Sequence, residues 1–202
     1  IYIPRFRNLY GEKRDYIRGF GYQGGGNRSG YMHEVAEYSI GKEYKEALTE
    51  PGPWQMGIGG FGETLPYHEN KVTLDKTKTD KWGLNVLAID CELKDNEHKM
   101  RKDMEADAAE MLTVAGVKNV KSRSDNPFLG RGIHEMGTAR MGKDPKTSVL
   151  NKWNQVWDAK NVFVTDGAFM ASANCCNPSL TYMAFTARAA DYAVSELKKQ
   201  NI

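Results

Sequence analysis

The chain has 202 residues, with 28 Lys and Arg against 26 Asp and Glu, which gives a formal net charge of +2. This balance creates no field that would steer a polyanion, and no basic run concentrates one, so nucleic acid is not an expected partner. No apolar stretch approaches the roughly 18–20 residues that cross a bilayer, so no membrane span is expected. At roughly 150 residues per domain, the length predicts one large or two small globular domains.

The start of the chain and its cysteines carry limited information. The first residue is Ile1, without an initiator Met or a signal-peptide pattern, so we expect a trimmed precursor or a piece of a longer protein. Two of the three Cys, Cys175 and Cys176, are adjacent. Disulfide frameworks have an even number of Cys at spread spacings, so no framework is expected. Adjacent Cys can form a strained ring, but we interpret this pair as two buried free thiols.

The first elements are predicted to be short strands on either side of one helix. Residues 16–18 predict a short strand that ends in a loop, and the Gly-rich, apolar residues 54–67 predict a strand with bends. Residues 32–48 have interleaved charges and no Pro, which predicts a helix, although Gly41 weakens it. The Pro-Gly-Pro sequence at residues 51–53 ends that helix.

A hairpin and an amphipathic helix are predicted next. The alternating residues 71–75, the polar residues 75–81 and the apolar residues 83–93 indicate a strand, a turn and a second strand. Residues 95–115 carry apolar side chains near i, i+4 spacing, which predicts a helix that Gly116 terminates.

The last third begins with a short apolar strand over residues 161–165, which ends at Asp166 and Gly167. A polar loop follows, and then a helix from about Pro178 to residue 199. Asn177 before Pro178 is typical of a helix start, because Asn caps helices and Pro suits the first helical position. By itself this pair indicates only a helix cap.

Two glycine patterns match the dinucleotide-binding motif G-x-G-x-x-G, at residues 19–24 and 57–62. The motif has meaning only where a strand precedes it and a helix opens at its third Gly. Residues 63–66 read Glu-Thr-Leu-Pro, which cannot open such a helix, and further glycines follow the first pattern. Neither pattern is therefore interpreted as a phosphate-binding loop.

The four histidines give no metal site, because no pair has ligand spacing and the adjacent Cys lack the gap of a zinc knuckle. His33 and His98 lie among charges and are expected to be solvated, and His68 lies in a turn-like stretch. His134 differs because it lies in the Gly-rich residues 130–142, where backbone and ligand can approach closely. A structural role is still the more common one for a His among glycines.

Three ordered blocks carry a resemblance to a known family. Residues 134–142 read His-x-x-Gly-Thr-x-Arg-Met-Gly, residues 161–168 read Asn-Val-Phe-Val-Thr-Asp-Gly-Ala, and residues 177–181 read Asn-Pro-Ser-Leu-Thr. Together they resemble the carboxy-terminal signature of glucose–methanol–choline (GMC) flavoprotein oxidoreductases. Weaker similar features are Glu63 and Pro66, residues 70–75, and residues 80–83. Within the family, the chain most resembles sugar dehydrogenases of the glucoside 3-dehydrogenase and gluconate dehydrogenase type.

The resemblance implies an α+β fold in which helices pack on one face of an antiparallel sheet. Residues 1–130 would be a portion of the substrate-binding domain. Residues 131–202 would return to the FAD domain and complete it with a strand and a helix. The family's Gly-rich ADP loop is absent, so we expect an amino-terminal FAD-binding half as the missing partner. We also expect the chain alone to lack FAD and to be inactive.

The resemblance also assigns roles in the oxidation of a CH–OH group of a sugar or polyol. His134 would be the base that takes the hydroxyl proton, while hydride passes from the same carbon to flavin N5. Asn177 would hold the substrate oxygen and also lie at the cofactor. The sugar, the oxidised carbon and the electron acceptor, O₂ included, are left open.

The cofactor-binding residues implied by the resemblance lie at two turns. Asp166 and Gly167 would lie against the ribityl–phosphate part of FAD. Pro178 and Ser179 would place a helix N-terminus, with its free N–H groups and partial positive charge, at the reduced flavin. If Asn177 caps this helix, its side chain is less free to hold substrate. A non-catalytic carbohydrate-binding module on the same scaffold, or an unrelated α+β protein, are the alternatives.

Overall fold

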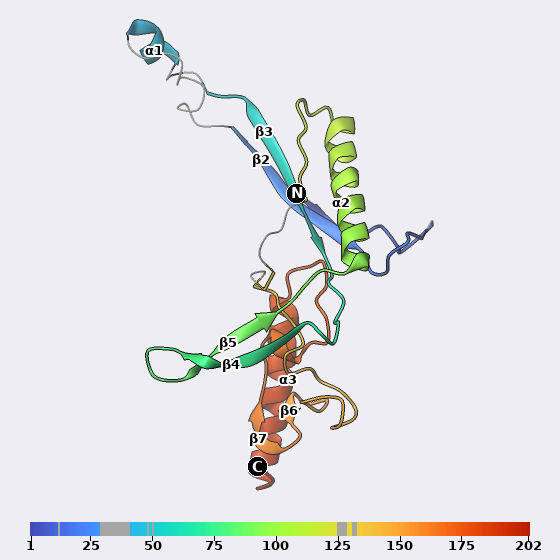
Figure 1. Cartoon of the computed structure of the whole chain (residues 1–202), viewed down its shortest axis with the longest axis vertical. Helices are drawn as coiled ribbons and strands as arrows, with labels where there is room; N and C mark the ends of the chain where they lie inside the picture. Colours follow the sequence, from blue (N-terminus) through green and yellow to red (C-terminus); the bar gives the residue numbers. More distant parts are fainter. Residues whose placement is uncertain (12, 29–40, 48, 50, 125–128, 131–132) are drawn as a thin grey trace.

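The structure is a computed structural model that describes residues 1–11, 13–28, 41–47, 49, 51–124, 129–130 and 133–202. The elements run in the order β1 (Tyr2–Ile3), β2 (Phe20–Arg28), α1 (Lys42–Ala47), β3 (Trp54–Gly62), β4 (Lys71–Thr79), β5 (Asn85–Asp90), α2 (Asp95–Val114), β6 (Gln155–Val156), β7 (Ala159–Phe163), the 3-10 turn η1 (Gly167–Phe169) and α3 (Ser179–Lys198). The mixture of helices and antiparallel strands that the sequence predicts is confirmed (Figure 1).

The first sheet is antiparallel, with strand order β1-β2-β3. Its register pairs Tyr22 with Gly60 and Gln23 with Gly59, so the second glycine pattern lies along β3, opposite much of the first. Neither pattern opens a helix, which confirms that they are not phosphate-binding loops. The glycines act in packing instead, since a Cβ at Gly60 would clash with the side chain of Met104 on α2. Small residues here let the helix approach the sheet.

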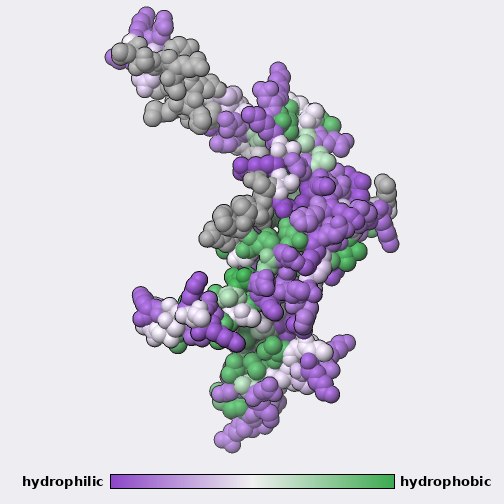
Figure 2. Space-filling model, in the orientation of Figure 1, coloured by the Kyte–Doolittle hydropathy of each residue, from purple (hydrophilic) through white to green (hydrophobic). Residues whose placement is uncertain are grey.

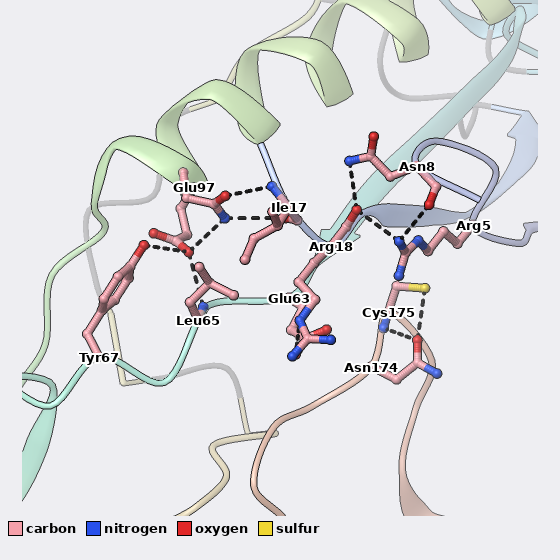
Figure 3. A network of polar contacts seen from close by, with 11 residues as sticks. Arg5, Asn8, Ile17, Arg18, Glu63, Leu65, Tyr67, Glu97, Asn174 and Cys175 are labelled. Atoms are coloured by element: carbon pink, nitrogen blue, oxygen red, sulfur yellow. Dashed lines mark hydrogen bonds and ion pairs between the residues drawn. The ribbon is translucent and has the colours of Figure 1, made fainter. Parts of the chain in front are cut away.

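The core of this part lies between the sheet and α2, where Tyr16, Phe20, Tyr22 and Met100 are buried. Residues 95–115 were predicted as a helix that Gly116 ends, and α2 confirms this, with Gly116 at φ +86°. The buried carboxylate of Glu97 fixes the start of α2 by accepting from Lys94 N at 3.1 Å. It also accepts from Leu65 N at 3.1 Å (Figure 3).

One strand prediction in this part is wrong. Residues 16–18 form a bend, and β2 begins only at Phe20. Arg18 has a φ of +73°, which is incompatible with an extended strand. Its carbonyl accepts from Arg5 Nη2 at 3.0 Å and from Asn8 Nδ2 at 3.0 Å, so side chains satisfy the backbone that no strand pairs (Figure 3).

The predicted hairpin is present as the antiparallel pair β4–β5. The first strand runs on to Thr79, so the turn lies later than the predicted residues 75–81. Asp75 explains the local irregularity, because its Oδ1 accepts from Thr77 N at 2.8 Å and from Lys78 N at 3.0 Å. The register shifts between Leu74 and Thr79 accordingly.

The carboxy-terminal elements form a second packed region around α3. The strand predicted over residues 161–165 is β7, and the helix predicted over about 178–199 is α3, with bounds shifted by one or two residues at all four ends. Leu150, Asn154 and Phe169 are buried here at 0%, 0% and 1% exposure.

The described strands make three separate small sheets, and not one sheet covered by helices. Of the described helices, α2 packs on β3, whereas α3 lies apart from that sheet beside β6 and β7 (Figure 1). His68 and His98 are exposed, while His33 and most of the helix predicted over residues 32–48 lie outside the described residues. Neither long helix in the described ranges is apolar enough to cross a membrane.

Candidate active site

His134 lies on the loop before β6, with its side chain half-buried. Its ring Nδ1 is 2.8 Å from the carbonyl oxygen of Ile133. Ile133 has a φ of +55°, which a β-branched residue rarely adopts, so the backbone is strained directly before His134. A carbonyl can only accept, so Nδ1 must carry the proton, and in a neutral ring Nε2 then has a free lone pair.

Asn177 lies at the start of α3 and faces this lone pair. Its Nδ2 is 3.2 Å from Nε2 of His134, although the two residues are 43 positions apart. The N-cap position of α3 belongs to Pro178, and no side chain within the described residues caps this helix. Asn177 is therefore not used as a cap, and its amide is directed at His134.

Asp166 and Gly167 follow β7, as the sequence predicts, although the strand ends at Phe163, three residues before Asp166. The Asp166 Oδ1 accepts from Ala168 N at 2.9 Å and caps η1, which leaves its second carboxylate oxygen outside this bond. Gly167 is buried, and a Cβ there would lie 2.7 Å from Tyr182 Oη and 3.0 Å from Glu135 O. Only a glycine lets this turn pass so close to the segment that follows His134.

Backbone hydrogen bonds join the first two sequence blocks. Ala139 N donates to Ala168 O at 3.0 Å, and Met141 N donates to Phe169 O at 2.9 Å. The side chain of Tyr182 on α3 reaches both blocks, since its Oη is 3.4 Å from Met136 Sδ. Burial, with Asp166 and Glu135 nearby, raises the pKa of Tyr182, so this hydroxyl stays protonated. All three blocks therefore meet in one region.

The N-terminus of α3 suits an anionic group. Pro178 is buried, Ser179 is exposed, and the absence of a side-chain cap from the described residues leaves the first N–H groups available. A helix end of this kind carries about half a positive charge. The chemistry of the residues present therefore fits the negatively charged part of a reduced flavin, next to His134 and Asn177.

The segment before Asn177 contacts the first sheet. Cys175 is buried, with its Sγ 3.2 Å from Asn174 Oδ1, and it lies beside Arg5 (Figure 3). Cys176 is exposed, so the prediction of two buried thiols is wrong for this residue, although both thiols are free. Tyr2 Oη donates to Cys176 Sγ at 2.8 Å, and this bond raises the pKa of Tyr2 to about 12.

One polar residue at the site was missed in the sequence. Gln23, on β2, donates from Nε2 to Asn177 Oδ1 at 2.7 Å. It lies within the glycine pattern at residues 19–24, which is not a phosphate-binding loop. No local signal separates it from other strand residues. Among the described residues, no group of three or more His, Cys, Asp or Glu is placed to hold a metal ion.

Comparison with known proteins decides the family. Residues 66–186 match the family model described as GMC oxidoreductase, which is more than half of the chain. The chain belongs to the GMC oxidoreductase family. Proteins of this family generally bind FAD. The matched residues include the His134 block, β7 and the first turns of α3.

Several named GMC relatives are similar to this chain. It is 33% identical over 192 residues to 2-methyl-1,2-propanediol dehydrogenase of Mycolicibacterium austroafricanum, covering 89% of this chain and 33% of that protein. It is 28% identical to the fructose dehydrogenase large subunit of Gluconobacter japonicus, over 79% of this chain and 29% of that protein. It is 29% identical to the gluconate 2-dehydrogenase flavoprotein of Pantoea cypripedii, over 72% of this chain and 25% of that protein. The chain thus spans a third or less of each of these relatives.

Proposed function

We propose that this GMC chain supplies the proton-accepting and substrate-holding side chains of an FAD-dependent oxidoreductase that acts on a CH–OH group of a sugar or polyol. The observation that carries this proposal is the 3.2 Å distance between His134 Nε2 and Asn177 Nδ2. An alcohol oxygen that loses its proton needs an acceptor for that proton and a donor for the charge that remains. The two side chains offer one of each at the same point.

The names of the relatives support the substrate class. One relative is named for a diol, one for fructose and one for gluconate, so each name specifies a small polyhydroxylated or hydroxylated compound. A half-buried His beside an exposed Asn suits such a compound, because the reacting hydroxyl can reach Nε2 from solvent. The dehydrogenase names favour an acceptor other than O₂, while other relatives are named oxidases.

In the proposed reaction, His134 Nε2 accepts the hydroxyl proton and Asn177 Nδ2 donates to the same oxygen. FAD, when bound, accepts the hydride from the carbon that bears this oxygen. The N–H group of Ser179 at the N-terminus of α3 would favour negative charge at a bound flavin ring, whereas Pro178 has no N–H and only begins the helix. Asp166 would accept from ribityl hydroxyls through its outer oxygen, with Gly167 allowing the close approach.

The same proposal divides the chain. Residues 1–130 would belong to the substrate domain, and residues 131–202, with β7 and α3, would complete an FAD domain supplied by an amino-terminal half. Apolar side chains lie exposed on α3, and Figure 2 shows apolar surface in its neighbourhood. They include Leu180 at 76%, Met183 at 61% and Leu197 at 62% exposure. Such surface is typical of a face that further protein covers, so we expect the isolated chain to be inactive.

The test is anaerobic flavin reduction. A protein that joins this chain to an FAD-binding segment should lose its oxidised-flavin absorbance when fructose, gluconate or 2-methyl-1,2-propanediol is added. His134→Gln should slow this reduction by roughly 10²- to 10⁴-fold, the usual range for a positioned base. The control is His98→Gln, at an exposed position on α2. Reduction at the original rate in His134→Gln contradicts the assignment of the base, and sugar binding without any reduction supports a binding module instead.

A further inference from the structure

Gln23 is the third member of a row of hydrogen-bonded side chains that ends at His134. Its Nε2 donates to Asn177 Oδ1 at 2.7 Å, and Asn177 Nδ2 is 3.2 Å from His134 Nε2. This row joins the middle of β2 to the start of α3, 154 residues away. Nothing in the three blocks that identify the family includes this residue.

The tautomer of His134 determines which groups donate and which accept in this row of three side chains. The carbonyl of Ile133 holds the proton on Nδ1 of His134, so Nε2 of the neutral ring can only accept. Asn177 must then present its NH₂ group to Nε2, and its carbonyl oxygen must point away. That oxygen needs a donor, and the amide group of Gln23 provides it.

A reversed Asn177 amide would disrupt every link. It would place Oδ1 of Asn177 against the lone pair on Nε2 of His134, so that two acceptors would face each other. It would also place Nδ2 of Asn177 against the amide N–H of Gln23, so that two donors would face each other. Only a proton on Nε2 and a reversed Gln23 would restore the bonds. A ring protonated at Nε2 cannot accept the proton of an alcohol there.

We propose that Gln23 is a positioning residue, which fixes the orientation of the Asn177 amide and thereby holds His134 in the Nδ1–H form, in which Nε2 keeps the lone pair that can accept a proton. This inference rests on the proposed function of His134 and Asn177. Gln23 touches neither the reacting hydroxyl nor the cofactor in this scheme and acts through Asn177.

The position of Gln23 suits this role. It pairs with Gly59 of β3 on one side and with Tyr2 of β1 on the other, so its backbone is held by two strands. A side chain on a rigid strand holds a partner more accurately than one on a loop. Asn177, by contrast, lies on the irregular segment that leads into α3, where its amide would otherwise be free to rotate.

The test reads the protonation of the His134 ring directly by long-range ¹H–¹⁵N spectra of the chain, with the resonance assigned through His134→Gln. We expect the Nδ1–H tautomer in the original chain. Gln23→Glu offers only acceptors, so Asn177 should reverse and the ring should become mainly Nε2–H or doubly protonated. Asn177→Asp should have the same effect, because it also places an oxygen against Nε2.

The matched control is Gln55→Glu, which makes the same change at an exposed position on β3, opposite Asn27. It should leave the His134 signals in place. An Nε2–H ring in the original chain overturns the proposal, as does an unchanged ring in Gln23→Glu when Asn177→Asp shifts it. If Gln23→Glu does not fold, Gln23→Met should give a mixture of tautomers, and an unchanged spectrum there overturns the proposal as well.

These spectra need neither flavin nor substrate, so the positioning role and the proposed function can fail separately. If the ring responds to substitution of Gln23 as expected but His134→Gln does not slow flavin reduction, the positioning role of Gln23 is supported and the assignment of His134 as the base is contradicted. In the flavin-loaded protein, Gln23→Met should lower kcat by roughly tenfold or more and change KM less, because it disturbs the proton acceptor and the Asn177 amide but removes no side chain that touches the substrate.

Discussion

The amide nitrogen of Asn177 lies 3.2 Å from Nε2 of His134, across 43 residues of sequence. The contact depends on two irregular segments, because His134 follows a strained Ile133 and Asn177 precedes a helix that it does not cap. The ring Nε2 of His134 and the amide of Asn177 are therefore both available for contacts with residues far away in the sequence. Under the proposed function, His134 would accept a proton and Asn177 would donate to the atom that lost it.

Replacing Asn177 should therefore weaken catalysis more than folding. Asn177→Ala removes the donor to the substrate oxygen, and loss of one such donor lowers the rate by roughly 10²- to 10³-fold. The measurement is the rate constant of anaerobic flavin reduction in the FAD-loaded protein. Asn161→Ala, at an exposed position on β7, makes the same chemical change away from the site. Equal rates for the two variants would contradict the role given to Asn177.

Gly167 gives a stability prediction at the proposed cofactor turn. In Gly167→Ala the new Cβ would lie 2.7 Å from Tyr182 Oη and 3.0 Å from Glu135 O, so buried neighbours must move. Overpacking of this kind costs about 1–3 kcal/mol of the free energy of unfolding. Denaturant unfolding of Gly57→Ala is the control, since a Cβ there meets nothing within 4 Å. A Gly167→Ala variant as stable as this control would show that the turn is not closely packed.

Tyr22 predicts how stability depends on alkaline pH. Its side chain is 1% exposed, and burial is the main reason that its pKa is raised above the ordinary value of 10.0. The native state therefore keeps this proton where the unfolded chain has lost it. Its stabilising contribution is complete below pH 10 and declines above that, by up to about 1.4 kcal/mol per pH unit.

The variant Tyr22→Phe separates this effect from other titrations. At neutral pH it should cost about 1 kcal/mol, because Tyr22 Oη donates to Met104 O at 2.6 Å. Above pH 10 its free energy of unfolding should fall less steeply than that of the original chain. Tyr10→Phe, at a side chain that is 89% exposed, is the control. Parallel pH curves for the original chain and Tyr22→Phe would contradict the prediction.

Local patterns predicted the long elements well. The i, i+4 spacing and Gly116 gave α2, and Asn177 with Pro178 gave the start of α3, because the signals for both lie within a few residues. The strand expected over residues 16–18 failed because side chains from Arg5 and Asn8 satisfy the Arg18 carbonyl in a left-handed bend. That arrangement depends on long-range packing, which a three-residue pattern does not contain.

The site was predictable only in part for the same reason. His134 and Asn177 lie in ordered blocks that resemble a family, so their types and spacing could be recognised. The distance between them needed the structure. Gln23 has no signal of its own, since its role depends on β2 lying beside the segment before α3, 154 residues further along. Residues that act through a neighbour in space are the ones that sequence patterns miss.

The adjacent thiols next to the site should differ in reactivity although they share one chain segment. The thiolate is the nucleophile, and burial raises the pKa of Cys175 above the ordinary 9.0, whereas the side chain of Cys176 is exposed. A raised pKa lowers the thiolate fraction at a given pH, and restricted access adds to this. At pH 8, iodoacetamide should therefore label Cys176 faster than Cys175, as measured by mass spectrometry of the peptides. In denaturant the two rates should become similar, because both differences arise from the fold.

Faster labelling of Cys175 in the native chain would mean that the segment before Asn177 does not pack against β2. The contact between Asn177 and Gln23 would then be contradicted as well.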